Sequence, residues 1–512
     1  MLKVNEFERD INSANTGLFP FSIDSNIHYR VNSLEDLEAD NYRLLSAMIE
    51  HFSTYQVPRL SVLDDYSKGR NTAIFGGARR KDDTKADYRI AHNFGKLIAQ
   101  FVAGYTTSVA IKYSLPEDKK LDDLMQDFNK RNDIKTLDNE LMFDVAKFGR
   151  AYEIQYKTEK KGTCIKQANV FETFVIYDTT IDRRPLAAVR IVENGFNSDV
   201  STQYVTILYT ADRIIHFKPS AFKESGLEID SEEKHLYAGV PIVEYQSNKY
   251  RTSWYEDVLP LIDAYDQSAS DTSNYMTDVI NSLLVISGDF STSGISASDM
   301  INQIKKYGVL GLQSGYDRNG NATNISANYI SPEFDSTTSE SYKERIRKDI
   351  FNISNIPDMS DENFSGNSSG VAMRYKIFGF EQAIGQTTNS FKRSLADRYE
   401  LLFNLNNSLS NSKTDHNNVQ AEFTPNLPYA VSEEVDMLNS VGVPVSRKTM
   451  YNQVHFTNAE TEEKNLEEEA KKDEANNADS VFKNNSSVIA PDQDKNATDD
   501  ETEAKDDDVN GQ

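Results

Sequence analysis

The chain has 512 residues, of which 38% are hydrophobic, and its formal net charge is −25. Its single cysteine, Cys164, excludes an intrachain disulfide and a cysteine-based zinc cluster. The acidic balance argues against tight, static binding to nucleic acid, because that affinity comes mainly from Lys and Arg at phosphates. It does not argue against DNA as a cargo that must slide.

Two targeting features are missing. No apolar run approaches the ~18 residues of a membrane span. The first ten residues, MLKVNEFERD, lack the apolar centre of a signal peptide. We therefore expect no membrane association, and synthesis in a cytoplasm.

In the N-terminal half, the sequence predicts a polar N-terminal segment over 1–39, called the polar lead below, and an α+β body over 40–250. Apolar residues at helical spacing predict a helix around 44–52 and another over 92–104, which Gly104 ends. A further helical stretch over 121–148 ends at Gly149. Segments that alternate or run apolar between turn residues predict strands at 151–156, 173–178, 186–192, 204–210 and 213–217.

Two long helices then flank a small β-rich insertion. Over 251–283, apolar residues from Trp254 onward recur every three or four residues for about 30 residues, as in packed helices. Pro260 predicts a kink in the first turns. After the insertion at 284–333, a second helix over 334–354 opens with a capping box from Thr337 to Glu340. We expect an antiparallel pair with the insertion at its far end.

A polar loop over 355–370 joins this pair to the longest helical pattern in the chain. Pro357 lacks an N–H and ends the preceding helix, and turn-forming residues follow. We expect a mobile loop. The helix over 371–409 contains Gly379 and Gly385, each costing about 1 kcal/mol against alanine, so a bend is expected there.

The C-terminal part reads as a small helical domain over 410–470 and an acidic tail over 471–512. From Glu460 to Gln512 there are 18 acidic and 6 basic residues, so about half of the net charge lies in this stretch. The tail has too few apolar residues to bury, and we expect it to be disordered.

No residue set has catalytic spacing. The seven histidines show no HxxxH or HxH pattern, and the carboxylates around Asp361 lie in a loop without fixed geometry for a metal. The Gly366–Gly370 run has no preceding strand and is not a nucleophile elbow. We therefore expect a protein that is not an enzyme, with no catalytic residues, no metal and no cofactor.

The order of these elements resembles that of the portal proteins of tailed bacteriophages, in particular the type found in long-tailed phages of Gram-positive hosts. The resemblance covers about residues 40–470. The stretches that carry it are 65–69, 93–113, 148–156, 239–250 and 356–376.

The resemblance implies a portal fold of the α+β class. Its parts are an α+β wing (40–250), a two-helix stem (251–283 and 334–354), a β-rich clip (284–333), a tunnel loop (355–370), a long kinked helix of the wing (371–409) and a helical crown (410–470). Such subunits form a homo-oligomeric ring, usually a dodecamer, at one capsid vertex of the virion. Double-stranded DNA is packaged and ejected through the ring.

The partners implied are the terminase large subunit, the head–tail adaptor, and capsid and scaffolding proteins, with assembly in the host cytoplasm. We expect the tunnel loop to touch DNA through Met359, Ser360, Asp361, Glu362, Asn363, Phe364, Ser365, Gly366, Asn367 and Ser368. We expect the clip to dock partners through Ile304, Lys305, Lys306, Tyr307, Leu310 and Leu312. The stem residues Lys343, Arg347 and Lys348 either contact phosphates in the channel or pair with acidic groups of an adjacent subunit.

Two other classes stay open on the sequence. A non-viral DNA-processing enzyme would need a metal or nucleophile set, which a nuclease assay would reveal. A filament-forming scaffold is suggested only by the narrow helical seam of 251–283, and imaging would distinguish it from a ring.

Overall fold

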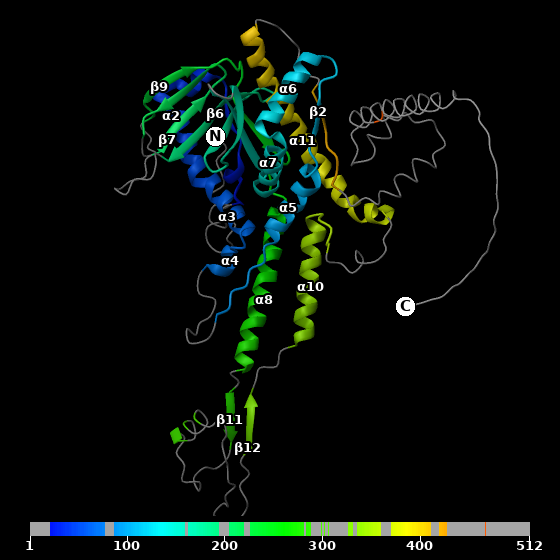
Figure 1. Cartoon of the computed structure of the whole chain (residues 1–512). Coiled ribbons are helices and arrows are strands. Elements are labelled where there is room, and N and C mark those ends of the chain that lie inside the picture. The colour runs from blue at the N-terminus through cyan, green and yellow to red at the C-terminus, as the bar shows by residue number, and fades with distance from the viewer. Residues whose placement is uncertain are drawn as a thin grey trace, which may run out of the picture. The chain divides into compact units, whose positions relative to one another are not determined.

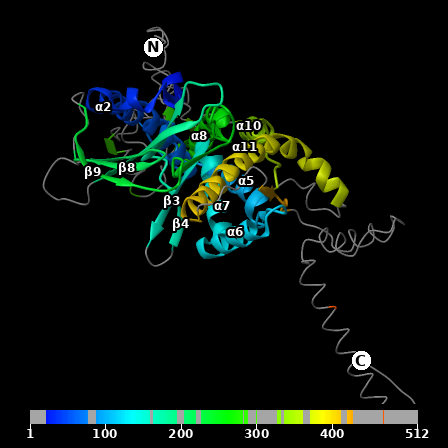
Figure 2. The same cartoon turned by 90° about the horizontal axis from the view of Figure 1, so that it is seen from above.

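The computed structural model of the chain describes residues 21–76, 87–158, 162–193, 204–219, 226–280, 283–287, 326–330, 335–359, 370–410 and 419–426, with single residues at 298, 299, 302, 306 and 466. The chain divides into two units, Met1–Leu427 and Pro428–Gln512, and every helix and strand with described bounds lies in the first. Figures 1 and 2 show the chain from two directions. Nearly all of the expected crown and the whole acidic tail lie outside the described residues.

The bounds of the elements are as follows. The helices are η2 (Ile23–Asn26), α2 (Leu34–His51), η3 (Phe52–Gln56), α3 (Val57–Ser67), α4 (Thr72–Phe75), α5 (Phe94–Thr107), α6 (Lys119–Asn132), α7 (Ile134–Phe148), η4 (Glu256–Val258), α8 (Leu259–Ile280), α10 (Ser336–Ile353) and α11 (Gly370–Ser410). The strands are β1 (Tyr29–Val31), β2 (Lys112–Ser114), β3 (Arg150–Thr158), β4 (Gly162–Ala168), β5 (Thr173–Asp178), β6 (Pro185–Glu193), β7 (Tyr204–Tyr209), β8 (Arg213–Phe217), β9 (Ile229–Lys234), β10 (Ile242–Gln246), β11 (Leu283–Ser287), β12 (Ser326–Ile330) and β13 (Gln420–Glu422).

A six-stranded sheet has the order β1-β5-β6-β7-β8-β9. Its strands from β5 to β9 are antiparallel, while β1 pairs parallel to β5. All five predicted strands are confirmed, four in this sheet and one as β3. Helix α2 and the π-helix η3 cover one face and share a core with it that includes Leu45, Phe52 and Phe174.

The N-terminal helical region extends further than the sequence indicated. Strand β1 and the start of α2 fall in the stretch expected to be a polar lead, and Leu37 is buried. Pro58 does not end this region, because it occupies the first turn of α3, where a missing N–H costs nothing. Residues Ala39–Tyr42 within α2 have non-helical backbone angles and kink it. The predicted helix around 44–52 is therefore part of a longer helical run that begins after this kink and continues through η3 and α3.

A second core lies around a three-stranded antiparallel sheet of order β10-β3-β4, with α5 and α7 packed together beside it. The prediction of a single helix over 121–148 was wrong. Asp133 takes a left-handed conformation (φ +50°) and separates α6 from α7. Asp tolerates this conformation better than most residues, so the break needs no glycine.

The sequence predicts that α5 ends at Gly104, but the helix continues to Thr107. The hydroxyls of Thr106 and Thr107 donate to the carbonyls of Val102 and Ala103, each four residues earlier. Gly149, by contrast, ends α7 as expected, with φ +78°.

The long helices follow the predicted order with three corrections. Helix α8 has 22 residues rather than about 30, and the 3₁₀-helix η4 precedes it. Pro260 therefore lies at the start of α8 and not inside it. The side chain of Asp335, rather than Thr337, caps α10 by accepting from the amides of Thr337 and Thr338.

Helix α11 runs unbroken from Gly370 to Ser410, close to the predicted 371–409. Figure 2 shows that its axis changes direction along its length. Strand β13, after α11, pairs antiparallel with β2, a pairing that local sequence patterns do not indicate. The mixture of helices and sheets confirms the α+β class.

Candidate functional site: the helix pair and its anchorage

Helices α8 and α10 lie side by side (Figure 1). The hydroxyls of Thr272 and Ser339 are 3.3 Å apart across the contact. Helix α8 leads into β11, β12 leads back into α10, and β11 pairs antiparallel with β12. The two helices are therefore antiparallel, and the insertion at 284–333 leaves and re-enters the pair at one end.

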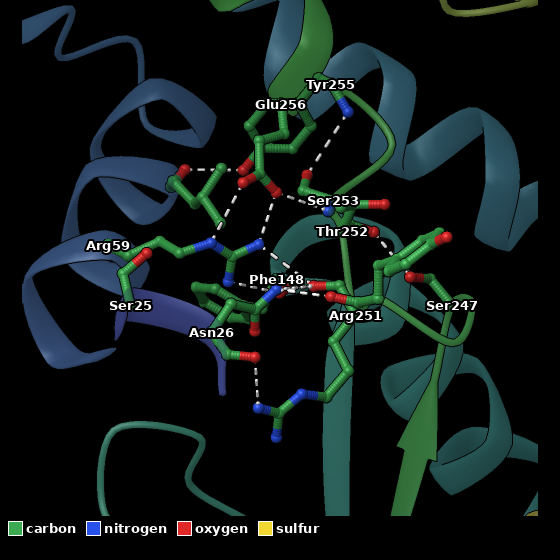
Figure 3. A network of polar contacts seen from close by, with 12 residues as sticks. Ser25, Asn26, Arg59, Phe148, Ser247, Arg251, Thr252, Ser253, Tyr255 and Glu256 are labelled. Carbon is green, nitrogen blue, oxygen red and sulfur yellow. Dashed lines mark hydrogen bonds and ion pairs between the residues drawn. The ribbon is translucent and has the colours of Figure 1, made fainter. Parts of the chain in front are cut away.

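The start of this pair is fixed by a buried arginine of α3. Arg59 donates from Nε to Glu256 Oε1 at 3.1 Å and from Nη2 to Glu256 Oε2 at 2.5 Å (Figure 3). Its side chain is 1% exposed. Glu256 also accepts from the Ser253 amide at 2.9 Å. A bidentate pair of this kind restricts position and direction at once, so η4 enters α8 in a fixed orientation.

A second buried arginine lies just before η4. Arg251 has φ +55°, and its Nη1 donates to Glu244 Oε1 of β10 at 3.0 Å. Burial alone would raise the pKa of Glu244, but the neighbouring cations, Arg251 first, lower it to about 2. Glu244 is therefore a buried carboxylate anion, and Tyr152 and Tyr177 also donate to it.

A different face of α8 holds residues 88–92, which belong to neither a helix nor a strand. Three polar side chains of α8, spaced four residues apart, accept from three backbone amides spaced two apart. The pairs are Asp266 with His92 at 2.9 Å, Ser270 with Ile90 at 2.9 Å, and Asn274 with Tyr88 at 2.7 Å. Four helical residues advance about 6 Å and two extended residues about 6.6 Å, so the two repeats match.

Two aspartates of α8 and the histidine His92 have partners within the fold. Asp266 is fully buried and also faces His92 Nδ1 at 2.8 Å. Asp263 accepts from the hydroxyl of Tyr66. Two of the acidic residues that the sequence places on α8 thus hold the fold together instead of facing solvent.

Helix α10 ends in a Schellman motif. Asn355 takes the left-handed conformation (φ +55°), and the Ile356 amide donates to the Phe351 carbonyl at 3.0 Å. Ile356 is buried, and Pro357 follows it. Asp358 then pairs with Arg347 of α10. The chain is therefore held up to the residue before Met359, which is 57% exposed.

The predicted stem cations all have carboxylate partners within the chain. Lys343 pairs with Glu340 at 2.5 Å, and its side chain is 14% exposed. Arg347 pairs with Asp358 and Glu344. Lys348 pairs with Glu344 at 3.4 Å and is the most exposed of the three, at 63%.

Helix α11 is anchored to the three-stranded sheet by a third buried arginine. Arg398 donates from Nη2 to Glu153 Oε2 at 2.7 Å and from Nη1 to Asp138 Oδ1 at 2.7 Å. All three side chains are at most 2% exposed. Ser394 of the same helix donates to the Glu244 carbonyl at 2.7 Å. Sequence reasoning missed these arginines and their partners; the signal that could have found them is a carboxylate within an apolar strand, as at Glu153 and Glu244.

The predicted loop and clip residues are mostly outside the described part of the chain. Of the loop set only Met359 is described. Of the clip set only Lys306 is described, and it is exposed. The structure therefore does not test whether these residues come together.

Two further searches cover the described ranges alone. Within them, no three His, Cys, Asp or Glu side chains are grouped so that they could hold a metal ion. Nor do these ranges include a helix both long and apolar enough to cross a membrane.

Known proteins that are similar to this chain include one phage portal protein and two particle necks. A portal protein of Clostridium phage phiCD119 is 23% identical over 377 residues, which cover 70% of this chain and 79% of that protein. Among solved structures, the neck of an empty GTA particle computed with C6 symmetry aligns with TM-score 0.41 and 14% identity, covering 74% of this chain and 97% of that one. The neck of a native GTA particle computed with C12 symmetry gives TM-score 0.41 and 12% identity, with coverage of 76% and 93%.

A protein-family model described as phage portal protein, SPP1 Gp6-like, matches residues 47–477. The match includes the three-stranded sheet, the six-stranded sheet except β1, the helix pair and α11. This chain belongs to the SPP1 Gp6-like family of phage portal proteins.

Proposed function

We propose that this protein assembles into a ring, usually of twelve subunits in the family, at one vertex of a phage capsid. Double-stranded DNA passes through the ring during packaging and ejection. The observation that carries the proposal is the family match over residues 47–477. Assembly takes place in the host cytoplasm, and the finished ring belongs to the virion.

The charge of the chain suits a DNA conduit. Twelve subunits at −25 each carry roughly −300. A like-charged tunnel repels the phosphate backbone and keeps DNA from binding statically. Because of that repulsion, DNA slides through the tunnel with low friction.

Imaging of the purified protein by negative stain tests the proposal. A ring with a central hole is the expected result. Monomers alone would contradict it, and filaments would favour the scaffold class. A nuclease assay with added divalent metal is expected to show no cleavage, and cleavage would favour the enzyme class.

Within this function we propose that residues 359–368 project into the channel and touch DNA. Support comes from the chain that precedes them, since the Schellman motif and the Arg347–Asp358 pair hold the chain up to Asp358. Lys343, Arg347 and Lys348 already have carboxylate partners, so we assign the DNA contact to the loop.

Deleting Glu362–Ser368 should leave rings assembled but reduce DNA packaging, because the shortened loop no longer reaches the DNA. Replacing the same residues by a Gly/Ser segment of equal length is the matched control for reach. Packaging is measured as nuclease-protected DNA per particle. Normal packaging by the deletion variant would contradict the proposal.

We also propose that the clip, around Ile304–Leu312, docks the terminase large subunit and later the head–tail adaptor. Capsid and scaffolding proteins are the other partners. Substituting Ile304, Tyr307 and Leu310 by Ala should weaken both associations in pull-downs with purified partners. If both associations survived unchanged, the assignment of the clip would be wrong.

A further inference from the structure

Arg150, the first residue of β3, has a buried guanidinium group with two unpaired donors. The residue is 0% exposed. Its Nη1 donates to Oε1 of Gln56, in η3, at 2.6 Å. Among the residues that the structure describes, its Nε and Nη2 have no hydrogen-bond acceptor. Because the large majority of buried polar groups have a partner, these two N–H groups point to an acceptor that is not one of these residues.

The two unpaired donors form the edge of the guanidinium group that binds a carboxylate elsewhere in this chain. Arg59 binds Glu256 through its Nε and Nη2 (Figure 3). Arg398 binds Glu153 through the same two atoms, at 3.1 and 2.7 Å. The hydrogens of Nε and Nη2 lie parallel, and an anion accepts from both at once. Arg150 therefore presents a bidentate anion-binding edge inside the protein.

The buried carboxylates near Arg150 already have their own donors. Glu244 accepts from four side chains, which are those of Arg251, Tyr152, Tyr177 and Gln246. Glu256 accepts from Arg59 and from the amide of Ser253. Three buried guanidinium groups, of Arg59, Arg150 and Arg251, thus face two carboxylates. This buried layer carries an excess of one positive charge.

The excess charge persists at neutral pH. Burial first, and then the cations Arg251 and Arg59, lower the pKa of Arg150 to about 10, so its guanidinium group stays protonated. The neighbouring His28 does not change the balance, because burial lowers its pKa to about 4 and its ring is neutral. Buried charges in proteins are normally paired. An anion beside Arg150 would complete the pairing.

We propose that Arg150 binds a chloride ion through its Nε and Nη2, between the two hydrophobic cores. Gln56 lies in η3, beside the core of the six-stranded sheet, and Arg150 precedes Ala151 of the other core. A water molecule would accept the two hydrogen bonds but leave the excess charge uncompensated, which is costly in the interior. Because Arg150 has no exposed surface, a monatomic ion fits and a larger anion such as a nucleotide does not.

The ion has an approach from solvent. A cavity of about 1040 Å³ is lined by Glu244 and Gln246 of β10 and by the exposed Arg183. Gln246 is the register partner of Arg150 in the pairing of β10 with β3. The cavity therefore reaches the residue beside Arg150. The proposal does not depend on the proposed ring.

Thermal denaturation at constant ionic strength tests the proposal. The full chain is melted in sodium gluconate and in sodium chloride, each at about 0.1 M, so that exposed charges are screened equally. Gluconate is too large for the buried layer. A ligand that binds only the folded state stabilises it, so chloride should raise the melting temperature. At about 100 times its dissociation constant the rise should be about 5 °C.

Substitutions at Arg150 locate the effect. Arg150→Met removes the guanidinium group and should melt at the same temperature in both salts. Arg150→Lys keeps the charge but lacks the bidentate edge, so it should lose most of the chloride effect. The matched control is Arg393→Met, which removes an exposed arginine of α11 and should keep the wild-type difference. If Arg150→Met kept that difference, chloride would bind elsewhere and the proposal would be overturned.

Anomalous X-ray scattering from bromide, a heavier substitute for chloride, locates the ion directly. In crystals of the wild-type protein grown with sodium bromide, we expect a peak beside Nε and Nη2 of Arg150. This measurement needs no variant, so it decides the question even if Arg150→Met does not fold. Absence of the peak, or equal melting of the wild-type protein in both salts, overturns the proposal and leaves water as the acceptor. Neither result bears on ring assembly, which imaging tests separately.

Discussion

Replacing Arg398 by methionine should destabilise the protein strongly. The substitution keeps much of the side-chain volume but leaves Glu153 and Asp138 buried without their cation. Breaking a buried ion pair by removing one partner costs about 3–5 kcal/mol. In a large domain each kcal/mol lowers the melting temperature by about 2 °C, so we expect a fall of about 6–10 °C at pH 8.

The loss of stability caused by Arg398→Met should be larger at high pH than at low pH. Burial raises the pKa of Glu153 and of Asp138, and Arg398 opposes that rise in each. Without the arginine both pKa values rise further above those of the unfolded chain, so the folded state binds protons that the unfolded state releases. The penalty is complete above the raised pKa values and fades as pH falls toward the unfolded values. The variant should therefore be less destabilised at pH 5.5 than at pH 8.

Differential scanning fluorimetry at the two pH values measures both effects. The matched control is Arg393→Met, since Arg393 is an exposed arginine on the same helix. It should shift the melting temperature by less than about 2 °C. A triple variant that adds Glu153→Gln and Asp138→Asn should recover part of the loss and its pH dependence. The reasoning would be refuted if Arg398→Met lost no more than the control, or lost equally at both pH values.

Three other substitutions test local features of the fold by thermal denaturation. Gly149→Ala should cost at least about 2 kcal/mol, because the position has φ +78° and a Cβ would lie 2.1 Å from the Arg251 carbonyl oxygen. Gly385→Ala should instead stabilise α11 by about 0.5–1 kcal/mol, since a Cβ there meets nothing within 4 Å; the opposite order of these two would contradict the geometry. Asp335→Ala should cost about 1 kcal/mol and speed hydrogen exchange in the first turn of α10, whereas unchanged exchange would show that another residue caps it.

The sequence predicts elements well where a local pattern decides them. The segments 173–178 and 213–217 coincide with β5 and β8, and α11 begins and ends within one residue of its predicted range. Strong apolar periodicity bounded by turn residues is enough for this. Element ends were predicted less well, because Pro260 and Gly104 are compatible with more than one position in a helix.

The anchorage of the helix pair and of α11 could not be predicted, because it depends on residues far apart in the chain. Arg398 meets a glutamate 245 positions earlier, and Arg59 meets one 197 positions later. Each arginine lies in a helix whose pattern is compatible with an exposed charge. Only a buried acid within an apolar strand, such as Glu153 in AYEIQY, gave a signal, and that signal does not name its partner.

Glu244 links these separate contacts into one rigid assembly. Its carboxylate binds Arg251, which precedes the helix pair, while its carbonyl accepts from Ser394 of α11. A shift of the start of the helix pair relative to α11 would separate at least one of these buried groups from its partner. A buried polar group left without a partner costs about 1–3 kcal/mol, and a buried charge costs more. Force applied along α8 and α10 is therefore carried into both the sheet and α11.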